Sequence, residues 1–195
     1  MKQQITLQQY RNIDLTILSV VLAIGQVLIH LASSKWFPDQ LYIVTPVAAM
    51  TALVMMRWSA WAWIPALLGG GLFTILSDGQ WYHFAIYCLG NLAALAALPV
   101  LKRAGKETVR NSAVWSVLFG LSVQLLMWTG RAAVGLALGH GWQTCLRFIT
   151  TDILSGLFTV LIIWIVRRID GLFEDQKHYL LRIQSENQVE GREQF

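Results

Sequence analysis

Residues 113–138 read AVWSVLFGLSVQLLMWTGRAAVGLAL, and this stretch decides the fold class. Its only charged residue is Arg131. The stretch is longer than the roughly 20 residues that an α-helix needs to cross the hydrocarbon layer of a bilayer, about 30 Å thick. Its length and continuity predict a transmembrane helix and not a strand of a membrane barrel.

Similar apolar segments make up most of the chain. Of the 195 residues, 55% are apolar and 13% are charged, about half the charged share of an ordinary soluble domain. A water-soluble domain of this size has too little interior to bury so much apolar surface. We therefore predict an all-α integral membrane protein, a bundle of about six transmembrane helices. The segments are approximately Leu15–Ser33, Leu41–Met56, Trp58–Leu76, Tyr82–Leu101, Ala113–Leu138 and Leu146–Val166.

The segments define three parts of the chain. Residues 1–14 are predicted to be a cytoplasmic N-terminal segment, residues 15–166 the transmembrane domain, and residues 167–195 a cytoplasmic amphipathic or disordered tail. The tail either lies on the bilayer surface or serves as a partner helix. Only Arg57 separates the second segment from the third, which predicts a tight turn on the inner side.

Basic residues predict the orientation. Positive charge stays on the cytoplasmic side of a membrane, so both termini are expected there, in a multi-pass protein of the bacterial cytoplasmic membrane. Because the basic residues lie in short runs between apolar segments, the net charge of +4 does not indicate nucleic-acid binding. Twelve of the 15 basic residues fall on the predicted inner side: Lys2, Arg11, Arg57, Lys102, Arg103, Lys106, Arg110, Arg167, Arg168, Lys177, Arg182 and Arg192.

Polar residues inside the spans are the candidate binding residues. An arginine at the centre of a span costs about 2.5–3.5 kcal/mol of insertion free energy. Arg131 is therefore expected to have a functional or structural role. Gln124, Trp128 and Arg131 are spaced i, i+4, i+7 and share one helix face. Asp152, with Ser155 and Thr159, marks a polar face on the last segment. The residues predicted to bind substrate all lie in the middle or outer half of the membrane: Gln26, His30, Tyr87, Asn91, Gln124, Trp128, Arg131 and Asp152.

Two interpretations of these residues stay open. Arg131 and Asp152 either pair with each other and hold the last two helices together, or they contribute to a pocket. The amides and His30 taken singly are typical of interhelical hydrogen bonds. Their shared depth favours a pocket, and an arginine fork with amides and an indole suits a small flat or carboxylated molecule. The sequence does not name that molecule.

Enzyme and metal motifs are absent from the sequence. It has no GxSxG or HExxH motif, no paired acidic motif of membrane transferases or proteases, and no Walker A motif. The two cysteines, Cys88 and Cys145, have no CxxC spacing. We therefore expect no catalytic activity, no metal and no cofactor, and any energy for transport has to come from other subunits.

Three stretches carry a resemblance to a known family. MRWSAWAWIPALLGGGLF (56–73) leads from a tight inner turn into a small-residue helix; YCLGNLAALAALPVLKR (87–103) and TDILSGLFTVLIIWIVRRID (151–170) follow it. Together with the chain length, the helix count and the outward-facing polar residues, they make the chain resemble the substrate-binding S component of an energy-coupling factor (ECF) transporter over about residues 10–170.

The resemblance implies capture of a vitamin or similar micronutrient and delivery with ATP-driven partners. It implies a transmembrane coupling subunit and ABC-type ATPases, with the coupling subunit packing on small residues at i and i+4 of the first helix. Ser19 and Ala23 match that pattern, and Val27 departs from it. The alternative is a structural or scaffolding membrane subunit similar to the rod-shape proteins of cell-wall synthesis, in which the same polar residues only hold helices together.

Overall fold

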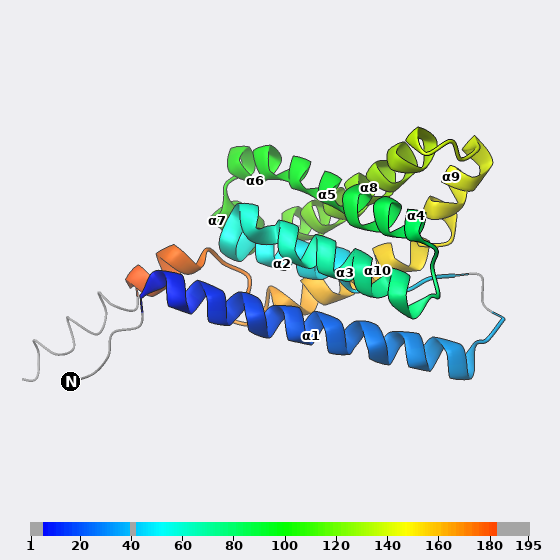
Figure 1. The fold of residues 1–195 in the computed structure, drawn as a ribbon. Helices are drawn as coiled ribbons and strands as arrows, with labels where there is room; N and C mark the ends of the chain where they lie inside the picture. Colours follow the sequence, from blue (N-terminus) through cyan, green and yellow to red (C-terminus); the bar gives the residue numbers. More distant parts are fainter. Residues whose placement is uncertain (1–5, 40–41, 183–195) are drawn as a thin grey trace, which may run out of the picture.

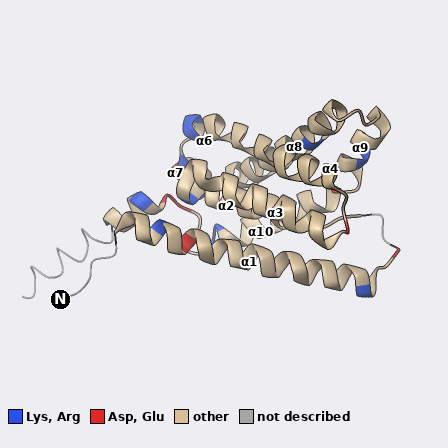
Figure 2. Cartoon of the chain, in the orientation of Figure 1, with Lys and Arg blue, Asp and Glu red and all other residues tan. Residues whose placement is uncertain are grey.

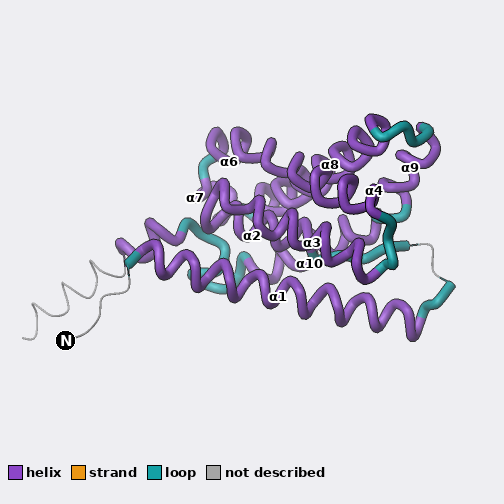
Figure 3. The backbone as a smooth tube through the Cα atoms, viewed as in Figure 1, coloured by secondary structure: helices purple, strands orange, loops and turns teal. Residues whose placement is uncertain are grey.

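The computed structural model describes residues 6–39 and 42–182 (Figure 1). Every element in these two ranges is helical, without a β-strand among them, and short loops join the helices (Figure 3). The all-α fold class is confirmed, and the helices have the length and composition of a multi-pass membrane protein. Five helical stretches are long and apolar enough to cross a membrane: Leu7–Trp36, Val47–Leu76, Trp81–Ala104, Ala113–Ala137 and Trp142–Val166.

Helix α1 (Leu7–Trp36) lies along the outside of the bundle (Figure 1). Thr6 caps its N-terminus in a capping box with Gln9, which explains why the helix begins before the apolar segment does. Every third or fourth residue is buried against the bundle, and the remaining apolar side chains face outward, as expected of a helix in contact with lipid. The outward set is Ile13, Ile17, Val20, Val21, Ile24, Val27, Leu28 and Leu31.

The stretch Val47–Leu76 folds back on itself. Helix α2 (Val47–Trp58) ends at Ser59, whose positive φ of 53° reverses the chain; a 3₁₀ turn (Ser59–Ala62) then leads into α3 (Trp63–Leu76). A Cβ atom added to Gly69 would come within 2.5 Å of the side chain of Val47, so the start of α2 lies beside the middle of α3. The two helices therefore form a hairpin with the tight turn that the sequence predicts after Arg57.

Residues 42–46 enter the bundle before α2 in a non-helical form. The Ile43 amide donates to the Thr151 carbonyl (2.7 Å), and the Thr45 amide donates to Ser155 Oγ (2.8 Å). The helix expected from Leu41 thus begins six residues later, because Pro46 disfavours helical geometry at the preceding residue. Bonds to the last membrane stretch satisfy backbone groups that lipid cannot satisfy.

The stretch Trp81–Ala104 is irregular along its length. It consists of α4 (Trp81–Phe84), a π-helical turn (Ala85–Leu89), α5 (Gly90–Leu92), a 3₁₀ turn (Ala93–Ala97) and α6 (Leu98–Ala104). It crosses α8 (Ala113–Ala137) closely, since a Cβ added to Gly90 would lie 2.7 Å from the Arg131 backbone. A short helix, α7 (Lys106–Asn111), connects the two.

The last stretch runs beside α8 and is broken once. Helix α9 (Trp142–Thr150) and helix α10 (Ile153–Val166) are separated at Thr151 and Asp152. Cys145 lies near Gly135, and Gly156 lies near Trp128, so the stretch is antiparallel to α8.

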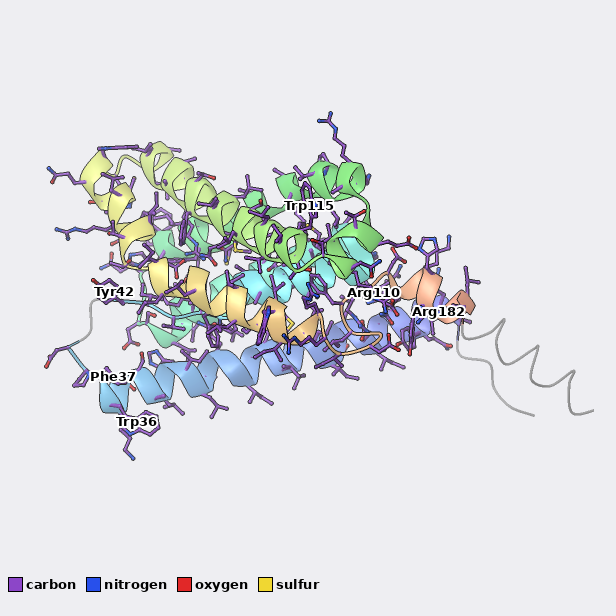
Figure 4. All side chains as sticks on the ribbon, turned by 180° about the vertical axis from the view of Figure 1, so that it is seen from behind. Trp36, Phe37, Tyr42, Arg110, Trp115 and Arg182 are labelled. Carbon is purple, nitrogen blue, oxygen red and sulfur yellow. The ribbon has the colours of Figure 1, made fainter. Side chains whose placement is uncertain are left out.

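The two ends of the described chain lie at the same end of the bundle (Figure 1). Tyr10 of α1 donates a hydrogen bond to Gln176 (3.2 Å), and Arg57 donates to the carbonyls of Gly171 and Leu172 (2.8 and 2.9 Å). Arg110 forms ion pairs with the same C-terminal segment, and Figure 4 shows it beside Arg182. The part of the predicted tail that is described, residues 167–182, therefore packs on the protein's own helices; residues 183–195 lie outside the described residues.

Most of the Lys and Arg positions lie toward this same end (Figure 2). Lys35, in the last turn of α1, and Arg147, in α9, lie toward the opposite end. The bundle thus has a basic end that carries both ends of the described chain and a far end with few charges.

Candidate functional site

A buried carboxylate, Asp152, is the centre of a polar cluster between α8 and α10. Its Oδ2 atom accepts hydrogen bonds from Gln124 Nε2 (3.0 Å), Trp128 Nε1 (2.8 Å) and Arg131 Nη1 (2.6 Å). The three donors occupy one face of α8, as their spacing predicts. Asp152 is 1% exposed and Arg131 3% exposed, so their ion pair is almost entirely shielded from solvent.

The cluster extends from Arg131 to the neighbouring helices. Arg131 Nε donates to Asn91 Oδ1 (2.8 Å), and Asn91 Nδ2 donates to the carbonyl of Ala66 in α3 (3.2 Å). The ring of Tyr87 lies 5.0 Å from the Arg131 guanidinium carbon, within the range of a cation–π contact. Residues from four membrane stretches are therefore joined through one arginine.

Asp152 has one oxygen that the cluster leaves without a partner. Its Oδ1 atom is buried and makes no hydrogen bond. An ion pair inside a membrane bundle is stabilising only when its remaining lone pairs are satisfied as well. Of the two interpretations that the sequence leaves open, the direct Arg131–Asp152 pair describes this conformation, and Oδ1 is the atom that the pair does not use.

The backbone is irregular on three sides of the cluster. Tyr87 belongs to the π-helical turn, Asp152 lies at the break before α10, and residues 42–46 run beside that break in a non-helical form. π-Turns inside α-helices occur frequently at functional sites, and non-helical backbone within a membrane is found where it lines a protein-enclosed site. Pure helix–helix contacts need none of these departures.

Gln26 and His30 lie outside the cluster, in an adjacent cavity at the far end of the bundle. The cavity has a volume of about 300 Å³ and lies between α1, the segment after it and the end of α3. Gln26 is 3% exposed, and its Oε1 atom is buried without a hydrogen-bond partner. Of its aromatic members, Phe37 lies at the end of α1 and Tyr42 lies where the chain returns to the bundle (Figure 4). The lining residues are Gln26, Ile29, His30, Ser33, Ser34, Phe37, Pro38, Tyr42, Ile43, Val44, Phe73 and Ser77.

Two residues connect the cavity to the cluster. Phe73 lines the cavity, and its ring centroid lies 4.6 Å from that of Tyr87, which in turn contacts Arg131. Ile43 lines the cavity, and its backbone is bonded to Thr151 beside Asp152. The cavity and the cluster therefore share a wall.

The structure brings six of the eight predicted binding residues into one cluster and places the other two, Gln26 and His30, in the neighbouring cavity. Thr159, on the predicted polar face of α10, donates to Gln124 Oε1 (3.3 Å). Sequence reasoning did not include Phe73 or Thr45. Phe73 has no polar signal that would mark it, whereas Thr45, directly before Pro46 near the start of the segment Leu41–Met56, carries a recognisable sign of an interrupted helix.

Ser19 and Ala23, the predicted docking residues, line a shallow groove of about 450 Å³ between α1 and α3. Trp61 and Leu68 form its other wall. The groove lies on the outer surface of the bundle, away from Asp152, so a partner helix there leaves the cluster untouched.

A larger cavity, of about 690 Å³, lies at the basic end near Ser59, α7 and the C-terminal segment. Cations of its lining form ion pairs with acids of the same lining: Lys106 pairs with Asp175 (2.6 Å), and Arg110 pairs with Glu174. The lining has four Lys or Arg residues and three acids, so its charges nearly balance and it has little preference for a ligand of a single charge; we do not place the substrate site there. Within residues 6–39 and 42–182, no group of three or more potential metal ligands comes together.

Comparison with known proteins gives no relative for this chain: no protein-family model, no curated protein and no solved structure matches it.

Proposed function

We propose that this protein is a membrane-embedded substrate-binding subunit that captures a small molecule from outside the cell, as the S component of an ECF-type importer does. The observation that supports this best is the set of irregular backbone segments around the Arg131–Asp152 cluster, next to a cavity with an unpartnered amide oxygen. Irregular backbone and unsatisfied polar atoms are costly in a membrane. A binding site is a reason for both.

In this proposal the chain crosses the membrane six times, with both termini in the cytoplasm. The α2–α3 hairpin counts as two short crossings, and a chain whose two ends lie at the same end of the bundle crosses an even number of times. The basic end is then cytoplasmic, in agreement with the distribution of Lys and Arg. The cavity with Gln26 and His30 then faces the outside.

In this proposal, partner subunits supply the energy for transport and cause release of the substrate. The groove with Ser19 and Ala23 is the proposed contact for a transmembrane coupling subunit, which in turn contacts ABC-type ATPases. Small side chains allow a second helix to approach closely, which is the main source of helix affinity in lipid. The substrate is proposed to be a vitamin or similar micronutrient.

The proposal is tested by purifying the protein in mild detergent and identifying small molecules that are released on denaturation by mass spectrometry. A stoichiometric metabolite, absent from a sample of an unrelated six-helix protein prepared in parallel, is the expected result. No bound metabolite, together with no ligand that raises the melting temperature, would refute the proposal.

One observation favours a second function, a scaffolding subunit of a larger membrane complex. The Arg131–Asp152 pair already joins four membrane stretches without any ligand, which is what structural polar residues do. A scaffold would co-purify with stable protein partners other than an ATPase and would carry no metabolite. The two functions thus predict different contents of the same purified sample.

A further inference from the structure

Buried side-chain atoms without a hydrogen-bond partner are nitrogens toward one end of the bundle and oxygens in the rest of it. In the described residues they are Arg11 Nε and Arg167 Nη1 toward the basic end, and Gln26 Oε1, Thr45 Oγ1 and Asp152 Oδ1 in the part that contains the cavity and the cluster. The second group consists of oxygens only. The Gln26 amide oxygen and the Asp152 carboxylate oxygen accept hydrogen bonds and donate none, whereas the Thr45 hydroxyl can do both.

These oxygens lie around one short segment, residues 43–46. Thr45 is part of it, and its amide is bonded to Ser155 Oγ, one helical turn after Asp152. Gln26 lines the cavity together with Ile43 and Val44. The acceptors therefore flank the same piece of chain, Gln26 on the cavity side and Asp152 on the cluster side.

Four donor groups of the cluster are already in use. Arg131 gives Nη1 to Asp152 and Nε to Asn91, while Trp128 and Gln124 give their N–H groups to the same Asp152 oxygen. A ligand carboxylate would have to compete with Asp152 for Arg131 Nη1, and Nε is held by Asn91. A ligand N–H group in the cavity, in contrast, finds a free lone pair on Gln26 Oε1 and relieves the cost of burying that oxygen unpaired.

The volume and the lining of the cavity restrict the class of ligand further. A volume of about 300 Å³ is at the lower limit for small-molecule sites, and Phe37, Tyr42 and Phe73 supply flat apolar surface. Such walls suit a small ring, and an aromatic lining also favours a cation over an anion.

On the basis of the proposed binding function, we propose that the substrate is a small ring compound that presents an N–H donor, such as an amidine, amine or amino-heterocycle, to Gln26 Oε1. Gln26 lines the cavity and is the direct contact. Asp152 lies outside the cavity lining, on the other side of residues 43–46, and its carboxylate is held there by Arg131.

Three fragments of nearly the same shape test the proposal: benzamidine, benzamide and benzoate. They carry a charged N–H donor group, a neutral N–H donor group and a carboxylate on the same ring. Ligands of this size bind on the order of millimolar affinity, so binding is measured by saturation-transfer NMR and by the rise of the melting temperature in a non-ionic detergent. We expect saturable binding of benzamidine, weaker binding of benzamide and none of benzoate.

The matched variants are Gln26→Leu and Gln143→Leu. Gln143 lies in α9, is exposed and lies outside the cavity lining, so its variant controls for the loss of an amide. Gln26→Leu is expected to weaken benzamidine binding about tenfold, the effect of losing a hydrogen bond to a charged group, and Gln143→Leu is expected to leave it unchanged. If Gln26→Leu does not fold, Gln26→Glu takes its place, because it keeps the acceptor and adds negative charge; it should tighten benzamidine binding.

Failure of this inference is distinct from failure of the proposed function. Benzoate binding as tightly as benzamidine, or a well-folded Gln26→Leu variant with unchanged benzamidine affinity, overturns the inference. A co-purified metabolite with a carboxylate and no N–H donor also overturns it and leaves the binding function standing. A sample with no metabolite and no saturable fragment overturns both.

Discussion

Replacing Arg131 by alanine is the change from which we expect the largest single loss of stability. The substitution removes two hydrogen bonds, to Asp152 (2.6 Å) and to Asn91 (2.8 Å), and leaves the Asp152 carboxylate buried with only neutral donors. Removal of one partner from a buried ion pair typically costs about 3–5 kcal/mol. We expect a value near the upper limit, since Asn91 loses its donor at the same time.

The second change, Asp152→Asn, removes the buried charge that Arg131→Ala leaves without its partner. The double variant contains no buried ion, and the amide at position 152 still accepts from Gln124 and Trp128. The unpartnered Asn91 oxygen remains and costs about 1–3 kcal/mol. The double variant should therefore be more stable than either single variant, with a coupling free energy of about 2 kcal/mol or more.

The assay is reversible unfolding of the four proteins by sodium dodecyl sulfate in mixed micelles, followed by tryptophan fluorescence. Arg147→Ala is the matched control, because Arg147 is exposed in α9 at the same end of the bundle. Additive losses in the double variant, or a stable Arg131→Ala protein, would show that the ion pair does not hold the helices together. A stable Arg131→Ala protein that binds its co-purified metabolite about 10- to 100-fold more weakly would instead assign Arg131 to ligand binding.

Three other predictions concern the ends and the surface of the bundle. In a variant without Cys88 and Cys145, single cysteines at Gln80 or Gly141 should react with a membrane-impermeant reagent in intact cells and one at Gly105 should not; the reverse pattern would contradict the orientation. Ala23→Leu should prevent co-purification of a coupling subunit and spare ligand binding, whereas Val27→Leu, on the exposed face of α1, should preserve the complex. Burial favours the neutral form of Asp175, but the hydrogen bond and charge of Lys106 outweigh it and lower its pKa below the ordinary 3.8. The stability from that pair is therefore complete above the ordinary pKa and is lost as the pH falls through the lowered value. Protection of residues 167–182 against hydrogen exchange, taken relative to the intrinsic exchange rate at each pH, should therefore fall below about pH 4, and it should fall less in Asp175→Asn than in the unmodified protein.

The fold class could be predicted from the sequence because hydrocarbon imposes simple requirements on length and polarity. The spacing of Gln124, Trp128 and Arg131 on α8 was sufficient to place them on one face, and Asp152 was recognisable as a candidate partner because few other charges lie within the spans. The tight turn near Arg57 was likewise visible, since one charged residue between two apolar segments leaves no room for a loop.

The start of α2 and the separation of Gln26 from Arg131 could not be predicted in the same way. Periodicity assigns a continuous helix to any apolar run, and only the bonds of Ile43 and Thr45 to the last membrane stretch make an extended entry stable. Depth in the membrane placed Gln26 and His30 at the level of the cluster, but it does not fix which helices are neighbours. Helix α3 packs between the cavity and the cluster, with Phe73 against Tyr87. That arrangement depends on tertiary contacts that no local pattern encodes.

The cluster and the cavity together give a physical reason for the interrupted helices. A continuous α-helix from residue 41 would satisfy its own backbone and would have no need of Thr151 or Ser155 as partners. The non-helical segment instead places residues 43–46 between two buried acceptors, Gln26 Oε1 and Asp152 Oδ1, each of which costs stability while it is unpaired. A molecule in the cavity that donates a hydrogen bond to Gln26 Oε1 would remove that oxygen's cost only in the bound state, and this gain would contribute to its affinity. A scaffold gains nothing from such an arrangement, because partner helices could satisfy the same atoms permanently; we therefore place ligand binding ahead of scaffolding.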